Sequence, residues 1–193
     1  HNAEEFLKHC LARLDFARDL HFVTQTTIDT LDYSGESLNA GSKLILAARG
    51  EEKRKLQDYV PNLDWPDTWE NAKLVMPGVV ALAADEFEKY ETEELRIKTA
   101  LKYLEPFSEK LESIALIVLC DDASFVAESM ANFIWVTFTR SNPSHDVYGL
   151  GEKVEHKHWS CNAPLLIDAR KKPHHAPELK DEPEIIERAK RFF

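Results

Sequence analysis

The chain has 193 residues, of which 44% are hydrophobic and 30% charged, and its 24 basic and 34 acidic side chains give a formal net charge of −10. This composition excludes a disordered tail, a collagen-like repeat and a disulfide-stapled miniprotein, and the length suffices for one hydrophobic core. The negative charge repels phosphate backbones and anionic lipids, so we expect no nucleic-acid partner. No stretch approaches the ~18 consecutive apolar residues of a membrane span, so we expect no stable membrane insertion.

The cysteines and the termini indicate where the protein resides. Cys10, Cys120 and Cys161 are an odd number at wide spacing, which predicts reduced thiols in a cytoplasmic protein. Glu4 and Glu5 stand where a signal peptide would be basic, so we expect no signal peptide. The sequence starts inside a helical pattern and stops on two phenylalanines, and we therefore expect a piece of a longer protein.

The first half of the chain contains one helical pattern and several short apolar runs. Residues 2–14 begin with an asparagine and two glutamates, as a capped helix does, and then place apolar residues on one face. Residues 21–34 are rich in threonine and β-branched residues, and we expect their start to be extended. The apolar run 43–48 predicts a buried strand. The runs 73–76 and 79–84 flank a Pro-Gly pair and predict one bent strand or two short ones.

The second half alternates more clearly between helices and strands. Residues 91–112 predict a helix that ends or kinks at an internal proline, and residues 114–119 predict a central strand because every position is apolar. Residues 124–140 predict one apolar helix, followed by a glycine-flanked loop and a short strand at 164–168. The terminal segment 181–193 predicts an amphipathic helix.

This alternation predicts a single α/β domain over residues 1–193, a layered domain with a largely parallel sheet flanked by helices. The turn after the predicted central strand reads Cys120-Asp121-Asp122-Ala123 and holds no glycine. Its two carboxylates would repel a pyrophosphate, so we expect Asp121 and Asp122 to cap the next helix. Gly149 and Gly151 lie outside a strand-then-helix context and form no dinucleotide fingerprint.

One cluster of residues has the chemistry of zinc ligands but not the spacing of a tetrahedral site. A nucleophilic cysteine in it would need a nearby base and an electropositive site, and no oxyanion-hole motif is visible. Packing of Trp159 beside polar histidines is the alternative that the residues favour. The cluster comprises His156, His158, Cys161, His174 and His175.

Several blocks of the sequence resemble the UbiD-type decarboxylases, the 3-octaprenyl-4-hydroxybenzoate carboxy-lyase family. The resemblance covers most of the chain and is poorest at residues 51–112. The matching blocks are Val118-Leu119-Cys120-Asp121-Asp122, residues 133–143, Asp146-Val147, Lys157-His158-Trp159, Ala163-Pro164, Ile167-Asp168-Ala169-Arg170, Lys172-Pro173 and, earlier, Arg18-Asp19-Leu20-His21-Phe22, Gln25-Thr26-Thr27, residues 29–33 and Gly41-Ser42-Lys43.

The resemblance implies a part of a larger lyase. Members of the family use prenylated FMN and a divalent metal to decarboxylate aromatic or α,β-unsaturated acids reversibly, and we expect a role in ubiquinone or menaquinone biosynthesis. The family's Glu-Arg-Glu trio and its flavin and metal ligands belong to preceding domains. We therefore assign no catalytic, cofactor-binding or metal-binding residue here, and we expect this chain alone to be inactive and to hold neither cofactor.

The same resemblance implies that the chain is the C-terminal domain, which closes over the cofactor cleft and builds much of the dimer contact. Its partners would be upstream flavin-binding domains and further copies, in a dimer or higher homo-oligomer to which the helix at 181–193 contributes. Arg170, Lys171 and Lys172 are the candidates to face an anion across the cleft, unless they form a solvated basic turn. Two alternatives stay open: a free-standing interaction or regulatory subunit of a separate catalytic chain, and a small α/β enzyme acting through the histidine–cysteine cluster.

Overall fold

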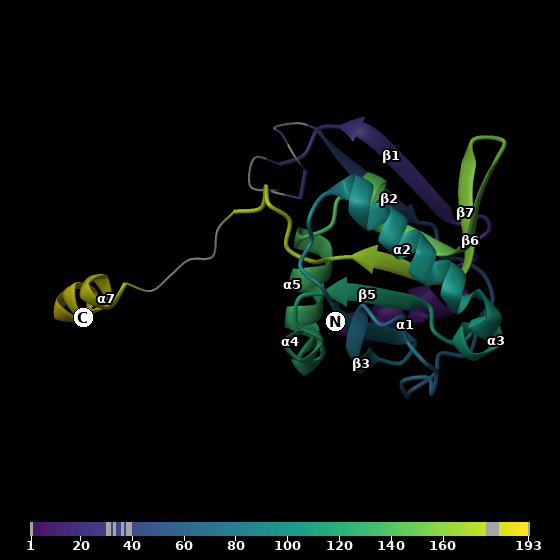
Figure 1. Cartoon of the computed structure of the whole chain (residues 1–193), viewed down its shortest axis with the longest axis horizontal. Coiled ribbons are helices and arrows are strands. Elements are labelled where there is room, and N and C mark those ends of the chain that lie inside the picture. Colours follow the sequence, from purple (N-terminus) through teal and green to yellow (C-terminus); the bar gives the residue numbers. More distant parts are fainter. Residues whose placement is uncertain are drawn as a thin grey trace.

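The computed structural model describes residues 2–29, 32, 34, 35, 37, 40–176 and 182–192. It shows a five-stranded sheet between helices, a separate two-stranded ribbon and a terminal helix (Figure 1). The elements are α1 (Ala3–Arg13), β1 (Leu20–Thr26), β2 (Gly41–Leu46), β3 (Trp69–Met76), β4 (Val79–Ala84), α2 (Tyr90–Leu104), η1 (Glu105–Phe107), α3 (Ser108–Leu111), β5 (Leu116–Cys120), α4 (Ala123–Glu128), α5 (Met130–Thr139), α6 (Pro143–Asp146), β6 (Val147–Glu155), β7 (His158–Asp168), α7 (Pro183–Ala189) and η2 (Lys190–Phe192).

The large sheet has the strand order β3-β4-β5-β7-β6 and is mixed. Strands β4, β5 and β7 run parallel, whereas the outer strands β3 and β6 are antiparallel to their neighbours. The α/β class is confirmed, but the expectation of a largely parallel sheet holds only for the three central strands. Each outer strand joins its neighbour through a tight turn, at Pro77-Gly78 and at His156-Lys157, and a tight turn can connect only antiparallel strands.

Strand β5 lies at the centre of the molecule and is buried at every position. Its side chains alternate between two cores, as the pleat of a strand requires. Leu116 and Val118 belong to the core under α4 and α5, and Ile117 and Leu119 to the core under α2 and α3. The prediction of a central strand at 114–119 is confirmed, and the sheet is a middle layer that is covered on both faces.

The predicted single helix over residues 124–140 is wrong. Two helices, α4 and α5, meet at Ser129, whose backbone is extended (φ −153°, ψ 154°). The Ser129 side chain accepts a hydrogen bond from Asn132 N and so begins a new helix. Asp122 accepts from the backbone N–H groups of Ser124 and Phe125, which confirms the predicted cap for that carboxylate.

Two other predictions need correction. The expected loop around residues 149–151 is strand β6, and β7 extends well before the predicted start at residue 164. The run 43–48 overlaps strand β2, but that strand is not buried in the large sheet. It pairs only with β1 in the described part of the chain, and Ile45 is 51% exposed.

The terminal segment contains α7 and η2, as the amphipathic pattern at 181–193 predicts, although residues 181 and 193 lie outside the described residues. Every described residue from 182 to 192 is exposed, and Figure 1 shows α7 apart from the sheet and its helices. None of the described helices has the length and apolar character needed to cross a bilayer. The assignment of residues 1–193 to a single domain stays a prediction.

Candidate functional site

Arg170 follows the end of β7 and forms the centre of a buried ion network. Its guanidinium donates to both carboxylate oxygens of Asp168 (2.9 and 2.7 Å), to Glu93 Oε2 of α2 (2.8 Å) and to the carbonyl oxygen of Asp85 after β4 (2.8 Å). All three charged side chains are at most 3% exposed. Burial by itself would raise the pKa of Asp168, but the bonds from Arg170 and nearby positive charges hold it below its ordinary value.

Lys172 is a second buried cation, two residues further along. Its Nζ donates to the carbonyl oxygens of Asp168 (2.6 Å) and Arg140 (3.0 Å) and lies 3.1 Å from Asp146 Oδ1. The other carboxylate oxygen of Asp146 accepts from Asn142 N (2.6 Å). Burial raises the pKa of Asp146 to about 7, although the charge of Lys172 opposes the shift. Lys172 therefore ties the ends of β7 and α5 to α6.

Lys171, between these two cations, is half-buried, and its backbone N–H donates to the Asp121 carboxylate. That carboxylate also accepts from Arg140 Nη1 (2.9 Å). The interpretation of residues 170–172 as a solvated basic turn is wrong for Arg170 and Lys172, whose charges are buried against carboxylates. That any of the three meets an anion across a cleft stays a prediction.

The turn after β5 does not suit a flavin phosphate. Asp122 occupies the first free N–H groups of α4, and Asp121 adds a second negative charge directly beside them. A phosphate would have to displace one carboxylate and approach the other, which is electrostatically unfavourable. Among the residues that the structure describes, no three His, Cys, Asp or Glu side chains are grouped so that they could hold a metal ion.

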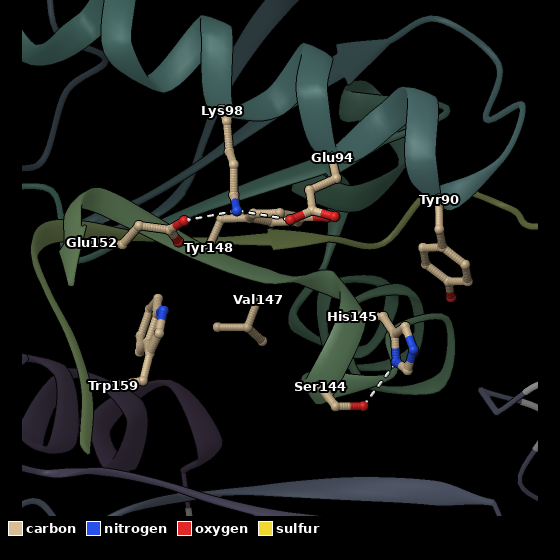
Figure 2. A pocket seen from close by; sticks show the side chains of 9 residues that line it. All are labelled: Tyr90, Glu94, Lys98, Ser144, His145, Val147, Tyr148, Glu152 and Trp159. Carbon is tan, nitrogen blue, oxygen red and sulfur yellow. Dashed lines mark hydrogen bonds and ion pairs between the residues drawn. The ribbon is translucent and has the colours of Figure 1, made fainter. Parts of the chain in front are cut away.

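A cavity of about 210 Å³ lies between α2, the α6–β6 junction and β7, as Figure 2 shows. Lys98 Nζ bridges Glu94 (2.7 Å) and Glu152 (3.3 Å) at one side of it. At another side the His145 ring packs on the Tyr90 ring at 5.0 Å. The full lining is Tyr90, Glu94, Lys98, Ser144, His145, Val147, Tyr148, Glu152 and Trp159.

Aromatic side chains line this cavity together with the Lys98 ion pairs at one side. Both carboxylates are engaged by Lys98, and Ser144 Oγ lies 2.8 Å from His145 Nδ1 at the first turn of α6. Sequence reasoning missed the cavity because its lining comes from three separated segments. The available signals were two blocks of the family resemblance, Asp146-Val147 and Lys157-His158-Trp159, which contribute Val147 and Trp159 to the lining.

The structure does not assemble the histidine–cysteine cluster. His156 is in the β6–β7 turn, and His158 packs on His21 of β1 at 5.7 Å between ring centroids. His174 and His175 pack on each other at 4.7 Å, after the Lys172 segment. Cys161 is buried in β7, and burial raises its thiol pKa to about 12, so the thiol stays protonated. These positions disfavour a nucleophilic or zinc-binding role.

Comparisons with known proteins agree with the resemblance. The family model for the 3-octaprenyl-4-hydroxybenzoate carboxy-lyase C-terminal domain matches residues 1–48, which include α1, β1 and β2. A Chlamydia pneumoniae protein named as a subunit of 4-hydroxybenzoate decarboxylase is 32% identical over 179 residues, which are 92% of this chain and 28% of that protein. An uncharacterized Chlamydia caviae protein is 28% identical over 187 residues, 97% of this chain and 30% of that protein. An uncharacterized Chlamydia trachomatis protein is 30% identical over 183 residues, 93% of this chain and 29% of that protein.

The chain thus spans about three tenths of the length of the curated relatives that it matches. The matches to the family model and to the named decarboxylase subunit both agree with the family that the sequence blocks indicate. The chain is a UbiD C-terminal-domain-like protein.

Proposed function

We propose that this chain is the assembly and cleft-closing part of a UbiD-like carboxy-lyase that reversibly decarboxylates aromatic or α,β-unsaturated acids in quinone biosynthesis. The observation that carries the proposal is the 32% identity, over 92% of this chain, to a protein named as a subunit of 4-hydroxybenzoate decarboxylase. The proposed location is the cytoplasm, and the proposed partners are flavin-binding domains and further copies of the protein.

The geometry supports a scaffolding role. Arg170 and Lys172 bind the ends of β7 and α5 to α2, α6 and the segment after β4, which makes this edge of the sheet a rigid unit. A rigid domain that closes over a cleft excludes water and strengthens the electrostatic interactions around a substrate carboxylate. Prenylated FMN, a divalent metal and the catalytic acids would be supplied by other domains of the enzyme.

The test compares three preparations: this chain, the flavin-binding part of the enzyme, and both together. CO₂ release from 4-hydroxybenzoate and flavin absorbance are measured for each. We expect the chain alone to be colourless and inactive, and its addition to increase turnover by the flavin-binding part. A yellow, active chain alone would contradict the proposal, as would a flavin-binding part whose turnover is the same with and without it.

A second candidate is a free-standing, non-catalytic subunit that pairs with a separate catalytic chain. The word "subunit" in the name of the Chlamydia pneumoniae relative favours it. The two candidates differ in whether one reading frame encodes both parts. Co-purification of an untagged flavin-binding chain with this protein would favour the separate subunit.

A further inference from the structure

The cavity between α2, the α6–β6 junction and β7 has no part in the proposed function. Figure 2 shows Trp159 and Tyr90 on opposite sides of it, with Val147 between them. The ion-paired row of Glu152, Lys98 and Glu94 runs along a third side. The volume of about 210 Å³ is below the roughly 300–1,000 Å³ of sites for drug-sized ligands, so a ligand here would be no larger than one ring with a short substituent.

Three aromatic side chains of the lining are held in place by the surrounding structure. The Trp159 ring meets the Phe22 ring of β1 edge-on at 5.4 Å, and the Tyr90 ring meets the Phe87 ring edge-on at 5.1 Å. Tyr148, the third aromatic residue, is only 6% exposed. Because these rings are already ordered, little side-chain entropy is lost when a ligand enters. Aromatic rings cover an apolar body, and their faces also attract a cation.

The charges of the lining favour a cationic ligand over an anionic one. Lys98 Nζ binds Glu94 (2.7 Å) and Glu152 (3.3 Å), and one positive charge between two carboxylates leaves this group one charge negative. Burial raises the pKa of the Tyr148 phenol, and the negative charges of four carboxylates, including those of Glu94 and Glu152, raise it further. A carboxylate ligand would add another negative charge to these surroundings, whereas an ammonium group would compensate the excess.

The hydrogen-bonding groups that the lining still offers are acceptors. Lys98 binds Oε1 of each glutamate, and no described residue donates a hydrogen bond to Oε2 of either. The Tyr148 hydroxyl likewise makes no hydrogen bond within the described part of the chain, although the residue is buried. Two of the donors are engaged, Lys98 by the carboxylates and Ser144 Oγ by His145 Nδ1 at 2.8 Å. A primary ammonium group has three donors and no acceptor, and it therefore matches these vacant acceptors.

We propose that this cavity binds a small primary ammonium compound with an aromatic body, the ring against Tyr90 and Trp159 and the ammonium group against Glu94 and Glu152. The position of Lys98 Nζ between the two glutamates shows that they can hold an ammonium group. Both glutamates are partly exposed to solvent, so the attraction is modest and the rings provide part of the affinity. The site consists only of residues of this chain and would exist whether or not the decarboxylase assignment holds.

The test is an NMR titration of the isotope-labelled chain with three probes of similar size and different charge: benzylammonium, benzyl alcohol and benzoate. We expect benzylammonium to shift the Trp159 indole N–H signal and to bind about fivefold more tightly than benzyl alcohol, and benzoate to bind most weakly. Tightest binding of benzoate would overturn the proposal. Equal affinities for benzylammonium and benzyl alcohol, or no shift of the Trp159 signal at millimolar concentration, would also overturn it.

Removal of one carboxylate tests the acidic side of the site. Glu152→Gln keeps the size of the side chain and should weaken benzylammonium binding about fivefold. Glu155→Gln is the matched control, because Glu155 lies on the same strand but is exposed and pairs with Lys153 (3.1 Å) outside the cavity. Its substitution should leave the affinity unchanged, and equal effects of the two substitutions would contradict the site. Circular dichroism checks that each variant is folded.

Removal of the lysine tests the sign of the charge that the site selects. Lys98→Met frees both carboxylates and should strengthen benzylammonium binding about fivefold. Lys102→Met makes the same change in net charge one turn later on α2, outside the lining, and should have little effect. Weaker benzylammonium binding or stronger benzoate binding by Lys98→Met would overturn the assignment to an ammonium compound.

Discussion

Five charged side chains are buried together at the carboxyl edge of the parallel strands: Glu93, Asp146, Asp168, Arg170 and Lys172. A buried charge is costly unless a partner of opposite charge and further hydrogen bonds compensate it. Here each carboxylate has a cationic partner within about 3 Å. Removing Arg170 would leave the buried Asp168 without its guanidinium partner and Glu93 with only the half-exposed Arg96.

Arg170→Met tests this network. We expect the free energy of unfolding to fall by about 3–5 kcal/mol, because Asp168 and Glu93 lose their shared buried partner. Arg96→Met is the control, since Arg96 also binds Glu93 (2.7 Å) but is half-exposed. Its loss should cost far less stability than the loss of Arg170, because solvent screens an exposed ion pair. Urea denaturation measures both, and equal losses in the two variants would contradict the buried network.

Asp146 should make stability depend on pH. Its folded pKa is about 7 and its ordinary value 3.8, so the native state binds a proton that the unfolded state releases between these values. Stability from this group therefore decreases as the pH rises from about 4 to 7. Asp146→Asn keeps an oxygen for Asn142 N but leaves the buried Lys172 without its carboxylate partner. We therefore expect a destabilised variant whose deficit relative to wild type shrinks as the pH rises from about 4 to 7.

Comparison with wild type at each pH is needed because His175 acts in the opposite direction. Burial and the charge of Lys172 lower the pKa of His175 to about 4, so its contribution to stability is lost as the pH falls from 6.5 toward 4. Both proteins contain His175, and its contribution cancels in the difference. Urea denaturation of wild type and Asp146→Asn across this pH range measures the difference in their stability. A stability difference that does not vary with pH would refute the role of Asp146.

The basic run at 170–172 is visible in the sequence. The sequence does not show whether its side chains face solvent or buried carboxylates. Asp168 precedes Arg170 by two residues, whereas Glu93 is 77 residues away. Only the packing of α2 on the sheet brings Glu93 to the end of β7. Composition shows that a cation is present, and the tertiary fold decides whether it meets solvent or a buried acid.

At the level of elements, a strand or helix was predicted correctly where its sequence showed a clear hydrophobic or capping pattern. β5 is apolar throughout because both of its faces are covered, and α1 shows both an asparagine cap and an apolar stripe. β6 was missed because its second half is exposed, so its polar residues and glycines resemble a loop. The break between α4 and α5 was missed because it depends on one residue, Ser129, which caps α5 in the middle of an otherwise apolar stretch.

The N-cap of α5, Ser129, can be tested by substitution. Ser129→Ala removes the side-chain oxygen that accepts from Asn132 N, and we expect it to cost about 1 kcal/mol of stability. Ser129→Asp supplies another good N-cap and should remain close to wild type. Thermal unfolding of the three proteins tests the cap. Equal destabilisation by alanine and aspartate would show that the break depends on packing instead.

At the level of the whole molecule, the β1–β2 ribbon is a separate sheet that packs on the body through Leu20 and Leu44 and through a few polar and aromatic contacts. Ser42 Oγ donates to Asn142 Oδ1 and accepts from Ser144 N (2.8 Å), and the Phe22 ring meets the Trp159 ring edge-on at 5.4 Å. A two-stranded ribbon is marginally stable without such support. The ribbon should therefore open at lower free energy than the five-stranded sheet, as local units of a protein commonly do.

Ser42→Ala tests whether the ribbon opens separately. The substitution removes both hydrogen bonds of the Ser42 hydroxyl and leaves Asn142 and Ser144 without this partner, at a cost of about 1–3 kcal/mol. We expect amide hydrogen exchange in β1 and β2 to accelerate about tenfold or more, while amides of β5 stay protected. Ser124→Ala is the matched control, because its hydroxyl accepts from Asn71 Nδ2 (3.1 Å) on the exposed side of the body. If β5 accelerated as much as the ribbon, the ribbon and the sheet would unfold as one cooperative unit, and closure over a cleft would have to move the whole domain.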